Sequence, residues 1–338
     1  MIINDIRLPK DFHTETFSGY KKVDVYKALF KCIDEYKIEE TCFWTIELLL
    51  SCQAPILYEK CILYLSKYIN VLNPKLPLVF VNRYSFWKNN KLNAKEAINN
   101  QSIRNHLIEL VLYLALSNKT KYGALPKVSE ADFKKEIILK KLKANQQTII
   151  NKYSQKNDPV EVNVLVNELW DRILNKKTQE ALYFFNMLLV LDKKKNIVCH
   201  LRNSEFIPKK FHSDFTMYLW YIFINESFIS HNRQTQSIVN NLFELSSYQY
   251  TKAKTAQLLI YVIKLLSFPN LDLNKPLCSA RHSIIQATAK VNFIIANKKS
   301  FEILKKKEKI EFIETSTKPP TENKMNKKEQ AMMSLDIF

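Results

Sequence analysis

The sequence predicts an all-α protein, and two observations support that prediction. Glycine occurs only twice in 338 residues, at Gly19 and Gly123. Tight hairpin turns and phosphate-binding loops use glycine for its positive φ, so glycine-rich nucleotide sites and a sheet built on such turns are excluded. Apolar residues instead recur at helical spacing along most of the chain. We expect two stacked multi-helix arrays, solenoid-like or bundle-like, followed by a disordered C-terminal tail.

The front array is expected over residues 22–120, after an irregular N-terminal segment at 1–21. Val25, Leu29 and Ile33 form one helical stripe in the first predicted helix. Links of two to four residues should make the first helices antiparallel neighbours. The helices predicted in this array cover residues 22–36, 38–53, 56–69, 80–88 and 103–116.

Two prolines interrupt the front array in "NPKLPLVF", residues 73–80. Each proline disfavours the helical conformation in the residue before it. We therefore predict a rigid extended corner at Pro74 and Pro77, with helix returning near Phe80.

A second helical domain is expected over residues 129–312, after a boundary in the polar stretch 117–130. Ser129 and Asp132 resemble a capping box that opens its first helix. The apolar run at 217–224 could be a buried strand, but Ser213 and Asp214 before it favour a capped helix. Further helices are expected at about 158–174, 177–192, 213–228, 233–247, 250–266 and 278–297.

The chain is strongly basic, with 51 Lys+Arg against 33 Asp+Glu and a formal charge of +18. This balance favours an anionic partner such as nucleic acid. The codon usage of an AT-rich genome could also supply the excess lysine without any ligand. The set with the best nucleic-acid-binding pattern follows Ser129, on a predicted helix that places Lys134 and Lys141 on one face. It comprises Lys134, Lys135, Lys140, Lys141 and Lys143.

The sequence offers no pattern that predicts an enzyme, a metal site, a cofactor or a small-molecule substrate. The six histidines are scattered, and none has the spacing to another ligand that metal sites require. Glu47 stands out within "FWTIELLL". We expect it to reach water at the helix edge, or to form a structural ion pair with Arg83 or a lysine of the first helix.

Six cysteines without a C-x-x-C pair indicate small buried side chains in a reducing compartment. No signal peptide precedes Asp5, Arg7 and Lys10. The longest apolar run, residues 217–224, is far shorter than the roughly 20 residues of a membrane span. We therefore expect an intracellular protein with no membrane partner.

The last residues, "KKEQAMMSLDIF" at 327–338, end a polar stretch with spaced apolar side chains. Such a pattern is typical of a docking peptide that orders on a partner. It resembles the peptides with which replication proteins hold a sliding clamp, although the aromatic pair of those peptides is reduced to Ile337–Phe338. Docking to another protein, or an inert end, remains open. The partner-binding residues that we expect are Gln330, Met333, Leu335, Ile337 and Phe338.

The front of the chain carries a second resemblance. Residues 18–52, followed by "NPKLPLVF" at 73–80, are similar to an uncharacterised helical family of large nucleocytoplasmic DNA viruses. The resemblance covers about the first quarter to third of the chain. It implies a viral factory in the host cytoplasm, or the virion, as the location, and it assigns no functional residue.

Taken together, these features predict a non-catalytic accessory or scaffold protein of viral DNA replication or transcription. It would bind nucleic acid through its basic helical surface and a protein partner through residues 327–338. The alternative is a virion structural protein, a minor capsid or core component.

Overall fold

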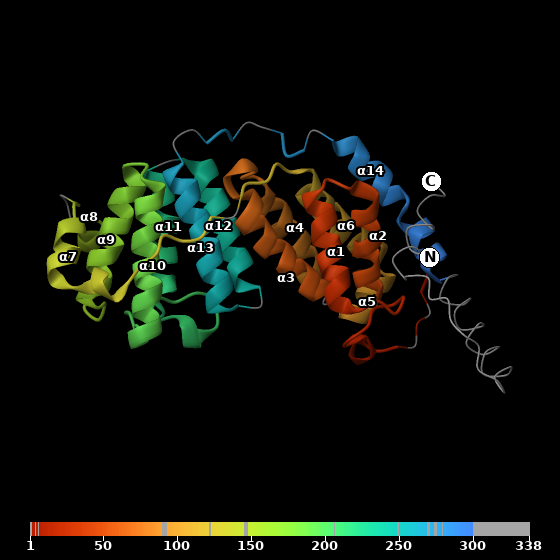
Figure 1. Cartoon of the computed structure of the whole chain (residues 1–338), viewed down its shortest axis with the longest axis horizontal. Helices are drawn as coiled ribbons and strands as arrows, with labels where there is room; N and C mark the ends of the chain where they lie inside the picture. The colour runs from red at the N-terminus through yellow and green to blue at the C-terminus, as the bar shows by residue number, and fades with distance from the viewer. Residues whose placement is uncertain are drawn as a thin grey trace, which may run out of the picture. The chain divides into compact units, whose positions relative to one another are not determined.

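The computed structural model describes residues 2–299, except for 4, 6, 90–92, 122, 145–147, 206, 231, 249, 269–270, 274–275 and 279. The chain divides into two compact units, Met1–Ile294 and Ile295–Phe338. In the second unit the described residues, 295–299, are helical. Within its described residues the first unit contains fourteen α-helices and no β-strand, so the predicted all-α fold is confirmed (Figure 1).

The front helices surround one central helix, α6. They are α1 (Lys22–Asp34), α2 (Ile38–Leu50), α3 (Ala54–Tyr64), α4 (Leu76–Asn89), α5 (Ala94–Asn99) and α6 (Gln101–Leu116). α6 contacts all five of the others. Its residues from Leu110 to Ala115 are buried without interruption, as expected for a helix that is apolar on nearly every side. A π-helical turn, η2 (Leu65–Ile69), and a 3-10 turn, η3 (Asn70–Leu72), link α3 to α4.

Four of the rear helices pack around α13. The rear helices are α7 (Lys135–Lys141), α8 (Thr148–Tyr153), α9 (Val160–Leu174), α10 (Thr178–Lys195), α11 (Phe215–Ser230), α12 (Arg233–Ser247) and α13 (Lys252–Ser267). α13 contacts α9, α10, α11 and α12. The apolar run at 217–224 is helical, within α11, and Asp214 Oδ1 accepts a hydrogen bond from the Thr216 N–H at the start of that helix.

Front and rear helices pack together within the first unit. α12 lies against α4, and α13 lies against α3, η2 and η3. At this junction the Tyr248 hydroxyl donates a 3.1 Å hydrogen bond to the Pro55 carbonyl, and the ring of Tyr248 contacts those of Tyr58 and Tyr84. α14 (Arg281–Ala289) packs against α2 and α6 of the front set. The proposed boundary at 117–130 lies in a stretch that is non-helical from 118 to 129 in its described residues, and the two-domain division stays a prediction.

Four of the described α-helices end in a left-handed residue that is not glycine; α10 ends in this way at Asn196, with φ 48°. Tyr36, Cys52 and Lys176 have φ values of 60°, 58° and 57°. After α1, the Tyr36 N–H bonds to Ile33 O and the following N–H bonds to Cys32 O, the paired hydrogen bonds of a Schellman motif. The same two hydrogen bonds of a Schellman motif close the ends of α2 and α9. A chain with almost no glycine therefore uses side-chain-bearing residues at these turns, at a conformational cost of about 1–2 kcal/mol each.

The predicted extended corner at 73–80 is wrong in its second half. The helix α4 begins at Leu76, with Pro77 as its second residue. A proline is tolerated in the first helical turn because the N–H that it lacks would have no partner there. The sequence analysis also did not predict α5, which Asn93 and Glu96 open with a reciprocal capping box.

Candidate functional site

The predicted nucleic-acid-binding lysines do not lie on one helix. Ser129 and Asp132 form the predicted capping box, in which the Ser129 N–H and hydroxyl donate to Asp132 Oδ2 at 2.7 and 2.9 Å. This box opens only a 3-10 turn, η4 (Glu130–Phe133), and the backbone is extended at Lys134 before α7 begins. Lys134 and Lys141 therefore share no helical face, and that part of the prediction is wrong. We call residues 134–143 the basic segment.

Lys141 is engaged within the protein. Its Nζ lies 2.5 Å from Asp132 Oδ1 and 2.5 Å from the Tyr183 hydroxyl. The hydrogen bond from Lys141, together with those from Ser129, holds the pKa of the Asp132 carboxyl well below its usual range. This ion pair links the end of α7 to η4, and the two elements lie in contact.

The other four lysines of the basic segment face solvent. Lys134, Lys135, Lys140 and Lys143 are exposed, and their side chains form no ion pair within the described part of the chain. Glu136 is the single acidic residue in the segment and is also exposed. The segment therefore presents a net positive surface that the protein itself does not neutralise.

Two buried side chains anchor the end of the basic segment to α9. Glu168 Oε1 accepts hydrogen bonds from the backbone N–H groups of Lys143 and Ala144, at 2.9 and 2.8 Å. Arg172 Nη2 lies 2.9 Å from Glu168 Oε2 and 3.3 Å from the Lys141 carbonyl oxygen. Both side chains are almost fully buried, with 3% and 4% of their surfaces exposed. The sequence analysis missed this pair, although its i,i+4 spacing on a helix was a usable signal.

The C-terminal end of α10 lies beside η4, the turn that precedes the basic segment. Lys194 Nζ forms a 2.5 Å ion pair with Glu130 of η4 and lies 5.8 Å from the centre of the Phe133 ring. Lys193 is exposed at the same helix end. Lysines at a helix C-terminus are favourable on dipole grounds alone, and here they also extend the positive surface of the basic segment.

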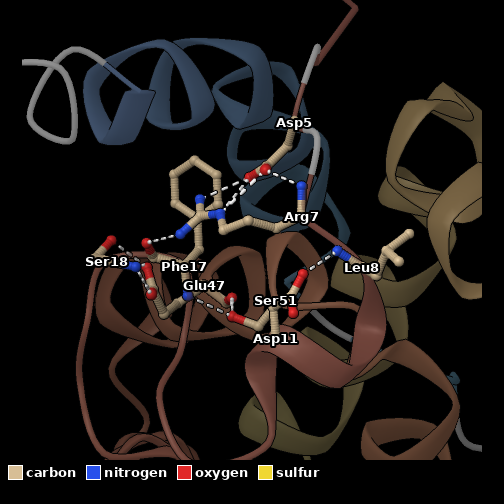
Figure 2. Close-up of polar contacts among 8 residues, drawn as sticks. All are labelled: Asp5, Arg7, Leu8, Asp11, Phe17, Ser18, Glu47 and Ser51. Atoms are coloured by element: carbon tan, nitrogen blue, oxygen red, sulfur yellow. Dashed lines mark hydrogen bonds and ion pairs between the residues drawn. The ribbon is translucent and has the colours of Figure 1, made fainter.

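Glu47 is completely buried, with 0% of its surface exposed, so the expectation that it reaches water is wrong. Its carboxylate accepts hydrogen bonds from the Ser18 N–H at 2.7 Å and the Ser18 hydroxyl at 2.8 Å (Figure 2). Arg83, one predicted partner, instead pairs with Glu109 at 2.6 Å. The N-terminal segment thus supplies a partner of Glu47 that helical periodicity could not reveal.

The N-terminal segment is fixed on α2 and α5 by further polar contacts. Ser51 Oγ accepts the Phe17 N–H at 2.8 Å, and the Asn99 amide exchanges two hydrogen bonds with the backbone of Ile3. Arg7 binds the carboxylate of Asp5 at 2.6 Å and donates to the Phe17 carbonyl (Figure 2). These contacts give Glu47 and Arg7 structural roles, and the pocket beside Arg7 and Asp5 has a volume of only about 20 Å³.

The described residues show where possible metal ligands and nucleophiles lie. No three His, Cys, Asp or Glu side chains among them lie close enough together to hold a metal ion. Burial raises the pKa of the Cys42 and Cys199 thiols to about 12, which makes them poor nucleophiles at neutral pH. The pocket beside Arg83 and His106 has a volume of about 10 Å³, room for about one water molecule.

The tail residues Gln330, Met333, Leu335, Ile337 and Phe338 lie outside the described residues, as does the predicted disorder of the tail. Among the described helices, none combines the length and the apolar character needed to cross a bilayer. Comparisons with protein-family models, with curated proteins and with solved structures found no match. A functional proposal for this chain therefore rests on its own residues.

Proposed function

We propose that the protein is a non-catalytic accessory or scaffold factor of viral DNA replication or transcription. It binds nucleic acid through the basic segment and a protein partner through residues 327–338. The observation that carries the proposal is that Lys134, Lys135, Lys140 and Lys143 are exposed and have no ion pair within the described chain.

The setting of these lysines suits phosphate binding. Glu168 and Arg172 hold the end of the segment by hydrogen bonds to its backbone, which leaves the lysine side chains available. Each lysine that neutralises a phosphate releases condensed counterions, so the affinity falls steeply with salt. Because the lysines follow a turn and a short helix rather than one long face, contact with the phosphate backbone is favoured over readout of base edges.

The nucleic-acid proposal is tested with a fluorescent DNA duplex and a salt titration. Replacing Lys134, Lys135, Lys140 and Lys143 together with Gln should reduce the slope of log K against log[salt] by about three to four. The matched control carries the same loss of charge at exposed lysines elsewhere: Lys10, Lys21, Lys95 and Lys121. If both quadruple variants lose the same affinity, the net charge alone explains binding and the basic segment has no special role.

The partner proposal is tested by removing residues 327–338. The shortened chain should keep the thermal unfolding midpoint of the full chain but lose capture by an immobilised viral sliding clamp. Replacing Leu335, Ile337 and Phe338 with Ser should have the same effect, whereas Lys327→Ser with Lys328→Ser should not. Equal clamp capture by all these variants refutes clamp docking.

The same experiments separate this function from the virion alternative. A structural component of the particle should be abundant in purified virions and should bind no DNA in a salt-sensitive way. That combination of results would replace the accessory-factor proposal.

A further inference from the structure

We propose that the connection between α10 and α11 presents a docking surface for an extended acidic and aliphatic segment of a partner protein. The surface consists of Val160, Val198 and Leu201, which we call the aliphatic patch. Their side chains are unusually open for apolar residues, with exposed fractions of 74%, 61% and 54%. Its residues differ from those of the basic segment and from residues 327–338.

Asp158 joins the connection to the segment that leads into α9. This carboxylate, two residues before Val160, accepts the His200 N–H at 2.8 Å and two hydrogen bonds from the Arg202 guanidinium at 3.0 and 2.7 Å. The Asp158 side chain is fully buried and that of Arg202 is 6% exposed. The connection is therefore fixed against the start of α9, with Val198 and Leu201 on either side of the anchored His200.

Each of two exposed aliphatic residues in the connection is followed by a buried residue. Cys199 and Arg202 are buried, and their N–H groups donate to Ser213 O and His212 O at 2.8 and 2.9 Å. Val198 and Leu201 are exposed, and their N–H groups donate no hydrogen bond within the described chain. A segment held at both buried residues, with exposed aliphatic side chains and available backbone donors, suits an extended peptide.

The charges around the aliphatic patch indicate an acidic partner. Lys156 precedes the Asp158 anchor, Lys193 ends α10, and Lys209 and Lys210 lie in the turn that pairs with the connection. All four are exposed and form no ion pair within the described residues. Of the two exposed acids nearby, Glu161 is already paired with Lys195 at 3.1 Å, and Glu205 forms no ion pair within the described part of the chain. Aliphatic rather than aromatic side chains at the centre favour a peptide over stacked nucleobases.

The probe is a fluorescein-labelled peptide of sequence DVEVDLEVD, measured by anisotropy with the full chain. We expect saturable binding that weakens with salt. The double variant Val198→Ser with Leu201→Ser should weaken it roughly tenfold or more, since it removes the apolar area that the peptide covers. The matched control, Val23→Ser with Ile285→Ser, removes side chains of similar exposure, 62% and 57%, and should change the affinity by less than about twofold.

Two further peptides test the chemistry of the partner. KVKVKLKVK keeps the aliphatic residues and reverses the charge, and DSESDSESD keeps the charge without the aliphatic residues. Both should bind at least roughly tenfold more weakly than the probe. Equal binding of either peptide, equal loss in the control variant, or no binding of the probe would overturn the proposal.

Two other occupants would also overturn it. Sedimentation that shows a dimer of the full chain, abolished by the Val198 and Leu201 substitutions, would identify a second copy as the occupant. If deleting residues 327–338 raises the affinity for the probe roughly tenfold, the chain's own tail is the occupant that competes with the probe. Unchanged circular dichroism and thermal midpoints in all variants exclude misfolding as the cause of a lost signal.

Discussion

Replacing Asp158 with Asn should destabilise the protein far more than a typical surface charge change. The carboxylate is fully buried and accepts four hydrogen bonds, two on each oxygen. Oδ1 binds the His200 N–H and Arg202 Nη1, and Oδ2 binds the Gln155 N–H and Arg202 Nη2. In the Asn variant one of these oxygens becomes an NH₂ group, so two donors lose their acceptor and face another donor. Arg202 also keeps a buried charge without its counter-charge.

The magnitude follows from these losses. A hydrogen bond to a charged group contributes about 1.5–3 kcal/mol, and an orphaned backbone N–H costs about 1–3 kcal/mol. Breaking a buried ion pair by removing one partner typically costs about 3–5 kcal/mol. We therefore expect Asp158→Asn to lower the free energy of unfolding by about 3–5 kcal/mol.

Urea unfolding followed by far-UV circular dichroism measures this loss, which should lower the midpoint by at least about 1 M. Asp24→Asn is the control, since its pair with Lys27 is 3.8 Å long and its side chain is 65% exposed. That variant should stay within about 0.5 kcal/mol of the parent. Adding Arg202→Met to Asp158→Asn should recover part of the loss, because the unpaired buried cation is removed.

The pH dependence gives an independent check. Burial alone would raise the pKa of Asp158, but the donors from Arg202, Gln155 and His200 outweigh it and lower the pKa from its ordinary value of 3.8. The stabilisation is therefore present above pH 3.8 and is lost as the pH falls through the pKa of the folded state. A loss below about 1 kcal/mol at neutral pH, or a loss that persists unchanged at low pH, would refute the assigned role of the pair.

Three further predictions concern Glu47, Lys141 and Cys278. Glu47→Leu leaves the Ser18 N–H and hydroxyl without acceptors, so the free energy of unfolding should fall by about 2–4 kcal/mol. The Ser18 amide hydrogen should also exchange with deuterated solvent faster, as measured by mass spectrometry. An unchanged exchange rate would contradict the role of Glu47. Lys141→Met should cost about 1 kcal/mol, because its pair is partly exposed. The difference should be fully present above pH 3.8, the ordinary pKa of Asp132, and should be lost as the pH falls through the lower pKa of Asp132 in the folded state. Iodoacetamide should modify the folded protein at Cys278, the one cysteine that is not buried, and modification at any buried thiol would contradict the described burial.

Helix content was predictable where the apolar pattern and the capping residues agreed. In α11 both signals point to a helix, and the structure contains one. The extended corner predicted at Pro77 is wrong because a proline is tolerated in the first turn of a helix, where the residue before it can also be helical. The left-handed conformation of the helix ends at Tyr36, Cys52 and Lys176 could not be predicted, because glycine, its usual signature, is absent there.

The site was predictable in its residue types but not in its partners. Lysine clustering identified the basic segment, yet the pairing of Lys141 with Asp132 depends on a fold-back that periodicity does not encode. The partner of Glu47 comes from an irregular segment 29 residues away in sequence. Such contacts are set by tertiary packing, so a single sequence without aligned relatives gives no signal for them.

The packing of α14 against α2 and α6 has a consequence for synthesis on the ribosome. Lys290 reaches Glu39 across 251 positions of sequence at 3.1 Å, and Arg281 lies 165 positions after Leu116, the end of α6. At about 5–20 residues per second, the nascent front helices would wait roughly 10–30 s for the segment that covers them. During that interval the front helices expose apolar surface to solvent. This chain should therefore depend on holding chaperones during translation more than a repeat protein, in which each repeat packs against the one synthesised just before it.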